Sequence, residues 1–214
     1  MIKMVTLDFD GTTADTMPTL EKIAVRLMTE NYQLEESKAR TMYRNTTGLP
    51  FEQQIGILFP DKEMNDKVIT QFEKEKIESI FDLLLFIDAK EAISSLRRQG
   101  YLVAISSSTI QPTIEKYCLQ NGLDVDQILG YRKGFEKGKD HFDFLMKKFN
   151  LLAEEMVYVG DSLKDCERAQ GSEILFIAKL GMFSVEQFNE ISKSKIVIKD
   201  LLELIELIPK LNRK

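Results

Sequence analysis

The chain has 214 residues, of which 43% are hydrophobic and 29% are charged. This length suits one domain that carries a sizeable insertion, and the composition excludes a fibrous or largely disordered protein. The formal net charge of −5 provides no basic surface for nucleic acid, and no run of about 18 apolar residues predicts a membrane span. We therefore predict a protein that binds neither nucleic acid nor membrane.

Two features of the sequence predict a cytoplasmic protein. Residues 1–7 run directly into an acidic motif and leave no room for a secretory signal peptide. Cys118 and Cys166 lie in segments with helical patterns, and they form neither a CxxC pair nor a cluster with histidine. Buried, unpaired thiols are typical of a reducing compartment.

The first predicted element is a strand at residues 5–9. The stretch 18–85 that follows has no convincing strand and predicts several helices in succession, including a polar one at 65–79. We interpret residues 16–85 as an inserted, lid-like helical cap domain. Its clearest helix carries an apolar stripe that consists of Leu20, Ile23, Ala24, Leu27 and Met28.

The rest of the chain alternates short apolar strands with amphipathic helices, which is the pattern of a parallel sheet covered by helices. One of these helices is expected to begin with a capping box of Asp88 and Glu91 and to end at Gly100. We therefore predict an α/β, doubly wound, Rossmann-like core formed by residues 1–15 and 86–214. Its remaining strands are expected at 102–106, 128–131, 157–160, 174–178 and 196–198.

Two carboxylates follow the first strand at a tight turn. In an extended segment residues i and i+2 share a side, so Asp8 and Asp10 can converge on one ligand while Phe9 points into the core. Gly11 then lets the backbone turn sharply. Because α/β sheets place active sites at the carboxyl ends of their strands, this motif is a candidate site. The alternative is a turn that only caps the strand.

A second pair of carboxylates follows the strand expected at 157–160. Asp161 and Asp165 lie at the start of the next predicted helix. Aspartates at two strand ends suit a hard divalent cation such as Mg²⁺, which prefers oxygen ligands, whereas zinc would require His and Cys. The alternative is that Asp161 and Ser162 cap the helix and that Asp165 is an ordinary acid of its first turn.

Hydroxyl groups and lysines follow two further strands. Ser106 and Ser107 lie where hydroxyls and backbone N–H groups could hold an anion, although a hydroxyl-rich loop is also a common helix cap. Lys137 and Lys139 offer cations that could balance a phosphate. Their segment is not a P-loop, because its glycines are too close together and Asp140 stands where Ser or Thr is required.

These motifs, in this order, resemble those of the haloacid dehalogenase-like hydrolase superfamily along essentially the whole chain. Residues 8–12 (DFDGT) resemble the first motif, Ser106 the second, Lys137 the third and residues 160–165 the fourth. The helical insertion after the first strand is similar to the cap of the phosphoglycolate phosphatase and β-phosphoglucomutase branch. The resemblance implies the Rossmann-like fold and a phosphoryl-transfer activity.

The resemblance also implies roles for individual residues. Asp8 would be the nucleophile that forms an aspartyl-phosphate, and Asp10 the general acid and base. The presence of Asp10 favours phosphoester cleavage over the carbon–halogen chemistry of other branches. Lys137 would neutralise charge on the transferring group, with Lys139 as the second choice.

The ligand sets implied by the resemblance overlap with these catalytic residues. The phosphoryl group would be bound by Gly11, Thr12, Ser106 and Ser107. Mg²⁺ would be held by Asp8, Asp10 through its carbonyl, Asp161 and Asp165, the last of these directly or through a neighbouring ligand.

The resemblance therefore favours a Mg²⁺-dependent phosphatase acting on a small phosphorylated metabolite, with a monomer or weak dimer as the default assembly. A phosphomutase on the same scaffold is an alternative, as is a phosphate-binding module without activity. A signalling receiver domain also uses a strand-end Asp with Mg²⁺, but it would be a shorter chain without a helical insertion. His141, the one histidine, is expected to be a surface or helix-end residue.

Overall fold

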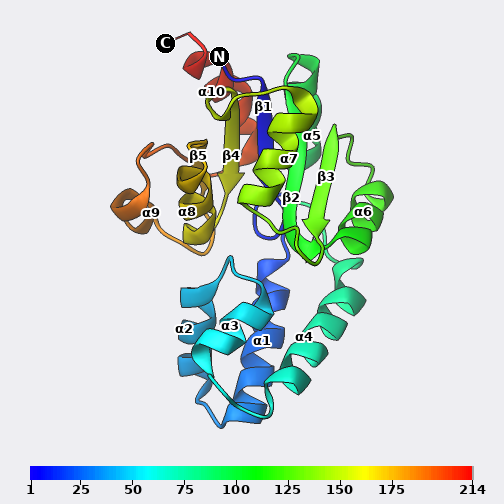
Figure 1. Ribbon diagram of the computed structural model, residues 1–214, viewed down its shortest axis with the longest axis vertical. Helices are drawn as coiled ribbons and strands as arrows, with labels where there is room; N and C mark the ends of the chain where they lie inside the picture. Colours follow the sequence, from blue (N-terminus) through cyan, green and yellow to red (C-terminus); the bar gives the residue numbers. More distant parts are fainter. Residues whose placement is uncertain (214) are drawn as a thin grey trace. The chain divides into compact units, whose positions relative to one another are not determined.

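The computed structural model describes residues 1–213 and divides the chain into two compact units (Figure 1). One unit combines Met1–Ala14 with Leu85–Lys214, and the other is Asp15–Leu84. Both boundaries lie one residue before those expected from the sequence. Within the described residues, no helix has the length and apolar character needed to cross a membrane.

The larger unit is a six-stranded parallel sheet with the strand order β3-β2-β1-β4-β5-β6. This topology confirms the predicted doubly wound, Rossmann-like fold. Its strands are β1 (Met4–Asp8), β2 (Leu102–Ile110), β3 (Gln127–Tyr131), β4 (Met156–Gly160), β5 (Leu175–Lys179) and β6 (Val197–Ile198). Its α-helices are α5 (Ala89–Arg98), α6 (Gln111–Gln120), α7 (Lys139–Phe149), α8 (Leu163–Gly171), α9 (Val185–Ile191) and α10 (Leu204–Leu211).

Each strand expected from the sequence is present, but β2 is longer than predicted. It continues beyond residue 106 because its register with β3 shifts after Ser106 and pairing resumes where Ile110 lies opposite Tyr131. An irregularity of this kind depends on the partner strand. The apolar run of one strand alone therefore does not reveal it.

The central strand β1 pairs with β2 on one side and with β4 on the other. All of its residues are buried, as expected for a parallel strand covered on both faces. The chain builds outward from β1 to β3 and then returns to β4, so the strand order reverses between β1 and β4. In doubly wound sheets, ligands bind outside the carboxyl ends of the strands at such a switch point.

Of the predicted start and end of α5, only the end is confirmed. Gly100 has a positive φ of 91°, as expected for the residue that ends α5. Asp88, however, makes no cap contact with α5. Its Oδ2 accepts the backbone N–H of Leu201 instead, while Glu91 binds Ser95 at 2.7 Å. The buried Asp88 carboxylate thus satisfies a distant backbone donor that local sequence does not predict.

The smaller unit, Asp15–Leu84, is helical as predicted. Stacked rings join its helices, with Tyr32 against Phe59 and Phe51 against Phe72 at centroid distances of 3.7 and 3.8 Å. The buried carboxylate of Glu21 accepts hydrogen bonds from two arginines of the second helix. The helices are α1 (Met17–Tyr32), α2 (Glu36–Thr46), α3 (Phe51–Leu58) and α4 (Asn65–Ile80).

The two points at which the chain passes between the units are paired with each other. Ala14 forms an antiparallel bridge with Leu85, and the N–H of Asp15 donates to the carbonyl of Leu84 at 2.9 Å. The insertion therefore leaves and rejoins the core at adjacent points, directly after the motif that follows β1.

Candidate active site

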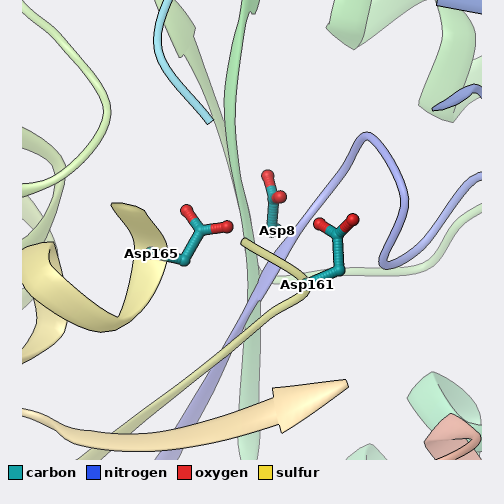
Figure 2. Close-up of side chains that lie close together, drawn as sticks. All are labelled: Asp8, Asp161 and Asp165. Atoms are coloured by element: carbon teal, nitrogen blue, oxygen red, sulfur yellow. The ribbon is translucent and has the colours of Figure 1, made fainter. Parts of the chain in front are cut away.

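Three carboxylates meet at the switch point between β1 and β4 (Figure 2). Asp8 is the last residue of β1, Asp161 follows β4, and Asp165 lies in the first turn of α8. One oxygen from each lies within 4.8 Å of the others, and all three side chains are buried. The structure thus brings together three of the aspartates singled out in the sequence, whereas the Asp10 carboxylate is not part of this cluster.

The turn from β4 into α8 fixes Asp165. The Ser162 hydroxyl donates to Asp165 Oδ2 at 2.6 Å, and the backbone N–H of Asp165 donates back to Ser162 Oγ at 3.2 Å. This is a capping box, so Asp165 both caps the helix and belongs to the carboxylate cluster. Gly160 leaves room for it, because a Cβ at Gly160 would lie 2.6 Å from the Asp165 Cβ.

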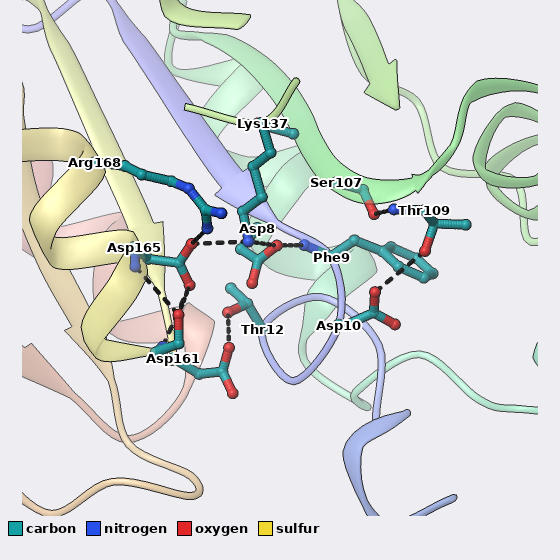
Figure 3. Close-up of polar contacts among 12 residues, drawn as sticks. Asp8, Phe9, Asp10, Thr12, Ser107, Thr109, Lys137, Asp161, Asp165 and Arg168 are labelled. Atoms are coloured by element: carbon teal, nitrogen blue, oxygen red, sulfur yellow. Dashed lines mark hydrogen bonds and ion pairs between the residues drawn. The ribbon is translucent and has the colours of Figure 1, made fainter. Parts of the chain in front are cut away.

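Lys137 lies between two of the carboxylates (Figure 3). Its Nζ is 2.7 Å from Asp8 Oδ1 and 2.8 Å from Asp165 Oδ1, and its side chain is 5% exposed. Lys139, in contrast, is 76% exposed and pairs with Asp143 on the surface of α7. The structure therefore places Lys137, the first choice from sequence, and not Lys139, beside Asp8.

Burial and crowding of like charges control the ionisation of this cluster. Burial raises the pKa of Asp8 well above its ordinary value, with Lys137 opposing this effect. Burial and the nearby Asp165 raise the pKa of Asp161 to about 7. Burial also opposes ionisation of Asp165, but Lys137 and Arg168 outweigh it and hold its pKa below the usual range. Lys137 forms ion pairs with both Asp8 and Asp165, so two of the three carboxylates share one buried cation.

The loop after β1 is tied to the cluster through hydroxyl and carbonyl contacts. The Thr13 hydroxyl donates to the carbonyl of Asp8 at 2.6 Å, and the Thr12 hydroxyl donates to Asp161 Oδ1 at 3.3 Å. Gly11, with φ of 79°, closes a turn in which its N–H donates to the carbonyl of Ala14 at 2.9 Å. The sequence predicted that Gly11 and Thr12 bind phosphate, which stays a prediction. Their observed contacts hold the loop in shape.

Asp10 lies on the other side of this turn from the carboxylate cluster (Figure 3). Its Oδ2 accepts the Thr109 hydroxyl of β2 at 3.2 Å. The backbone N–H of Thr109 in turn donates to Ser107 Oγ at 3.0 Å. Ser107 and Thr109 therefore hold the Asp10 carboxylate in place, and Thr109 is a site residue that the sequence motifs did not single out.

Ser106, unlike Ser107, contacts a residue of α7. Its Oγ lies 2.8 Å from Nδ1 of His141, and both side chains are fully buried. His141 therefore lies at a helix end, which is one of its two expected positions, but it is not on the surface. His141 is in the first turn of α7, on the side that packs against the sheet, where its ring lies 4.7 Å from that of Phe135.

Three further polar residues complete the surroundings of the carboxylates. The Tyr158 hydroxyl donates to Asp165 Oδ1 at 3.0 Å, and Arg168 Nη1 lies 3.6 Å from the same oxygen. The buried Lys179 at the end of β5 donates to the carbonyl of Gly11 at 3.3 Å. From the sequence, Tyr158 is only a residue of an expected strand, and Lys179 lies one residue beyond another. Arg168 lies three residues after Asp165, and this helical spacing is its one local signal.

The donor set fits a hard divalent cation. Asp8, Asp161 and Asp165 supply oxygen ligands only, which is the chemistry that Mg²⁺ prefers. Burial raises the pKa values of Asp8 and Asp161, and a divalent cation held by these carboxylates would favour their ionised form.

Comparisons with known proteins identify the family of this chain. The model of the haloacid dehalogenase-like hydrolase family matches residues 5–179. A phosphoglycolate phosphatase of Colwellia psychrerythraea is 24% identical over 181 residues, which are 78% of this chain and 79% of the relative.

Two solved structures share the fold. A haloacid dehalogenase-like family protein of Streptococcus pneumoniae has a TM-score of 0.81 at 17% identity, covering 97% of this chain and 98% of that one. CbbY of Rhodobacter sphaeroides, solved with phosphate, has a TM-score of 0.74 at 17% identity, covering 95% and 96%. With the family model matched across both acidic motifs and the lysine between them, this chain belongs to the haloacid dehalogenase-like hydrolases.

Proposed function

We propose that this chain is a Mg²⁺-dependent phosphatase that hydrolyses a small phosphorylated metabolite through an aspartyl-phosphate on Asp8. The observation that carries the proposal is the position of the Asp8 carboxylate at the end of the central strand, 2.7 Å from Lys137 and beside two further carboxylates. The family assignment supports hydrolysis, and the phosphoglycolate phosphatase relative supports a phosphate monoester as substrate.

The first step transfers the phosphoryl group to the protein. An Asp8 oxygen forms a bond to phosphorus while the bond between phosphorus and the ester oxygen breaks. Asp10 gives its proton to the departing oxygen, so the alcohol leaves neutral. Thr109 holds the Asp10 carboxyl for this transfer through its 3.2 Å hydrogen bond. Lys137 balances the negative charge on the phosphoryl oxygens.

The second step restores Asp8. A water molecule attacks the phosphorus of the aspartyl-phosphate and loses its proton to Asp10, which is now a carboxylate. The bond between phosphorus and the Asp8 oxygen breaks, and inorganic phosphate is released. Asp10 is then protonated again, as at the start of the cycle.

Asp8, Asp161 and Asp165 are the side chains that would hold Mg²⁺, with the Asp10 carbonyl as a further ligand from the family resemblance. When bound, the ion neutralises charge on the phosphoryl oxygens and draws the substrate towards the carboxylates. The Thr12 hydroxyl, 3.3 Å from Asp161 Oδ1, fixes the orientation of that carboxylate.

We assign substrate selection to the helical unit Asp15–Leu84, as the cap of this family branch. Its insertion directly after the motif that carries Asp8 and Asp10 supports this assignment. Exchanging this segment for that of a relative with a known substrate tests it. Substrate preference should follow the segment, and an unchanged preference would contradict the assignment.

The proposal is tested by phosphate release from an aryl phosphate and from a panel of small phosphoesters that includes phosphoglycolate. Release should require Mg²⁺ and should be lost in Asp8→Asn. A matched control is Asp143→Asn, because Asp143 is an exposed residue of α7 that pairs with Lys139. Loss of activity in both variants would point to unfolding and not to a catalytic role of Asp8.

A trapping experiment separates the phosphatase from the phosphomutase. Asp10→Asn cannot accept the proton of the attacking water, so it should retain labelled phosphate on Asp8 after incubation with an aryl phosphate, whose phenolate leaves without a proton from Asp10. Release to water in the wild type supports a phosphatase, whereas transfer of the label to an added sugar phosphate would establish a mutase. Absence of both label and release would leave a phosphate-binding module.

We also propose a cytoplasmic location and a monomer or weak dimer. The location is supported by Cys118 and Cys166, which are both buried and unpaired. Fractionation of cells and sedimentation over a range of concentrations test these two statements.

A further inference from the structure

The hydrogen bond between Ser106 and His141 links two parts of the active site. Ser106 lies opposite Asp8 in the register of the adjacent parallel strands β1 and β2. Lys137, which contacts Asp8, and His141, which contacts Ser106, come from the same short segment at the start of α7. One segment therefore contacts a side chain on each of two neighbouring strands, which lie about 5 Å apart.

The surroundings of the imidazole determine where its proton lies. Nδ1 is 2.8 Å from Ser106 Oγ, whereas Nε2 has no hydrogen-bond partner within the described part of the chain. The ring is neutral at neutral pH, because burial lowers the pKa of His141 to about 4. A neutral imidazole carries one proton, and a buried N–H without an acceptor costs more than a bare ring nitrogen. The proton therefore belongs on Nδ1.

This tautomer sets the direction of the Ser106 hydroxyl group. With Nδ1–H donating to its oxygen, Ser106 keeps its own proton for another acceptor. The opposite tautomer would make Ser106 donate to Nδ1 and would leave its proton engaged. The backbone of Gly130 is the competing acceptor, since hydrogen bonding to it raises the pKa of His141. The contact falls short of full hydrogen-bond geometry at Nε2, whereas Nδ1 and Ser106 Oγ lie 2.8 Å apart, and the bond to Ser106 is therefore the stronger of the two.

We propose that His141 is a positioning residue, whose Nδ1–H donates to Ser106 Oγ and turns the Ser106 hydroxyl so that it donates to a phosphoryl oxygen of the substrate on Asp8. The inference rests on the proposed phosphatase function for the identity of that acceptor. The direction of the bond between His141 and Ser106 does not depend on it.

The tautomer can be observed directly, since the chain contains one histidine. In protein labelled with ¹⁵N-histidine, a long-range ¹H–¹⁵N spectrum at neutral pH should show a protonated Nδ1 and a bare Nε2. The measurement needs no substrate and no variant. A proton on Nε2 would overturn the proposal and would assign that proton to the Gly130 carbonyl.

The coupling to turnover is tested by a double-mutant cycle. His141→Leu removes the donor and should lower kcat/KM roughly 3- to 10-fold, the value of one neutral hydrogen bond. His141→Asn, whose side-chain N–H lies near the position of Nδ1, should recover most of that loss. In a Ser106→Ala background, His141→Leu should cause little further loss, because its partner is already absent.

The possible results separate the inference from the proposed function. Losses that multiply in the double variant, in proteins whose circular dichroism matches the wild type, would make His141 a structural residue only and would overturn the proposal. If the variants do not fold, the wild-type spectrum still decides the tautomer. If the wild type hydrolyses no phosphoester, the proposed function fails. A shift of the Nδ1 resonance on addition of inorganic phosphate and Mg²⁺ would still show that an anion affects the hydrogen bond between His141 and Ser106.

Discussion

Replacement of His141 by asparagine should make the stability of the protein less sensitive to acid. The imidazole is fully buried, and its pKa falls from 6.5 in the unfolded chain to about 4 in the folded one. Between these two values the unfolded state binds more protons than the native state. The free energy of unfolding therefore falls as the pH drops through this window.

The size of the effect follows from the two pKa values. A tenfold change in the proton affinity of the imidazole corresponds to about 1.4 kcal/mol, so a fall of its pKa from 6.5 to about 4 removes roughly 3 kcal/mol once the pH is below both values. At a pH of about 4.5, most of this loss, roughly 2–3 kcal/mol, should already have occurred. A typical domain is stable by only about 5–15 kcal/mol, so the loss is readily measured.

Urea unfolding of the wild type and of His141→Asn, in buffers from about pH 7.5 to about 4.5, measures this difference. Asparagine does not titrate and keeps a donor for Ser106. The buried carboxylates Asp8 and Asp161, whose pKa values are raised, change stability in the opposite direction, but they do so equally in both proteins. Both series should contain a chelator, so that bound metal does not alter these carboxylates.

The two stability curves should diverge as the pH falls, with the wild type losing more. Parallel curves would refute the reasoning, because they would show that the imidazole is protonated in the native state as easily as in the unfolded one. Unchanged urea m-values in both proteins would show that the difference arises from the native state and not from the extent of unfolding.

Three further predictions concern the carboxylate cluster. Gly160→Ala should destabilise the protein by about 1–3 kcal/mol and weaken Mg²⁺ binding, because the new Cβ would lie 2.6 Å from that of Asp165. Thermal unfolding measures the first effect and calorimetry the second. The control is Gly171→Ala, which has no atom within 4 Å of its Cβ and should be neutral or stabilising. Lys137→Met should abolish phosphate release, while Lys139→Met should leave it intact. Equal losses in the two variants would contradict the choice of Lys137 as the lysine of the site. Addition of Mg²⁺ should raise the thermal midpoint of the wild type, since binding to the folded state alone stabilises it, and chelation should reverse the change; a midpoint that ignores Mg²⁺ would argue against a metal site.

The fold could be predicted because parallel strands are buried on both faces and read as continuous apolar runs. The six runs expected from the sequence correspond to β1–β6. The extension of β2 to Ile110 could not be predicted in this way, because it depends on a register shift against β3. Asp88 shows the same limit, since its partner Leu201 is remote in sequence.

The grouping of Asp8, Asp161 and Asp165 was predictable, because all three lie at or just beyond the carboxyl ends of adjacent strands. The choice between Lys137 and Lys139 was harder from spacing alone. It is decided where α7 begins, because Lys139 falls on the exposed side of the first turn and Lys137 precedes the helix. A lone polar residue in a helix, such as His141, gives no sequence signal for burial, since its partner Ser106 comes from another strand.

The adjacent crossings at Ala14 and Leu85 also affect how the sheet can assemble. Pairing of β1 with β2, where Met4 meets Leu102, must close a loop of roughly 100 residues, and contacts this distant in sequence slow folding. If the segment Asp15–Leu84 folds first, the hydrogen bond from Asp15 to Leu84 joins its two ends. The loop that remains to be closed is then roughly 30 residues long, and its entropic cost is lower by about 1 kcal/mol. The insertion then acts as a clamp at the start of sheet formation, and variants that break its closing hydrogen bond should slow refolding more than they speed unfolding.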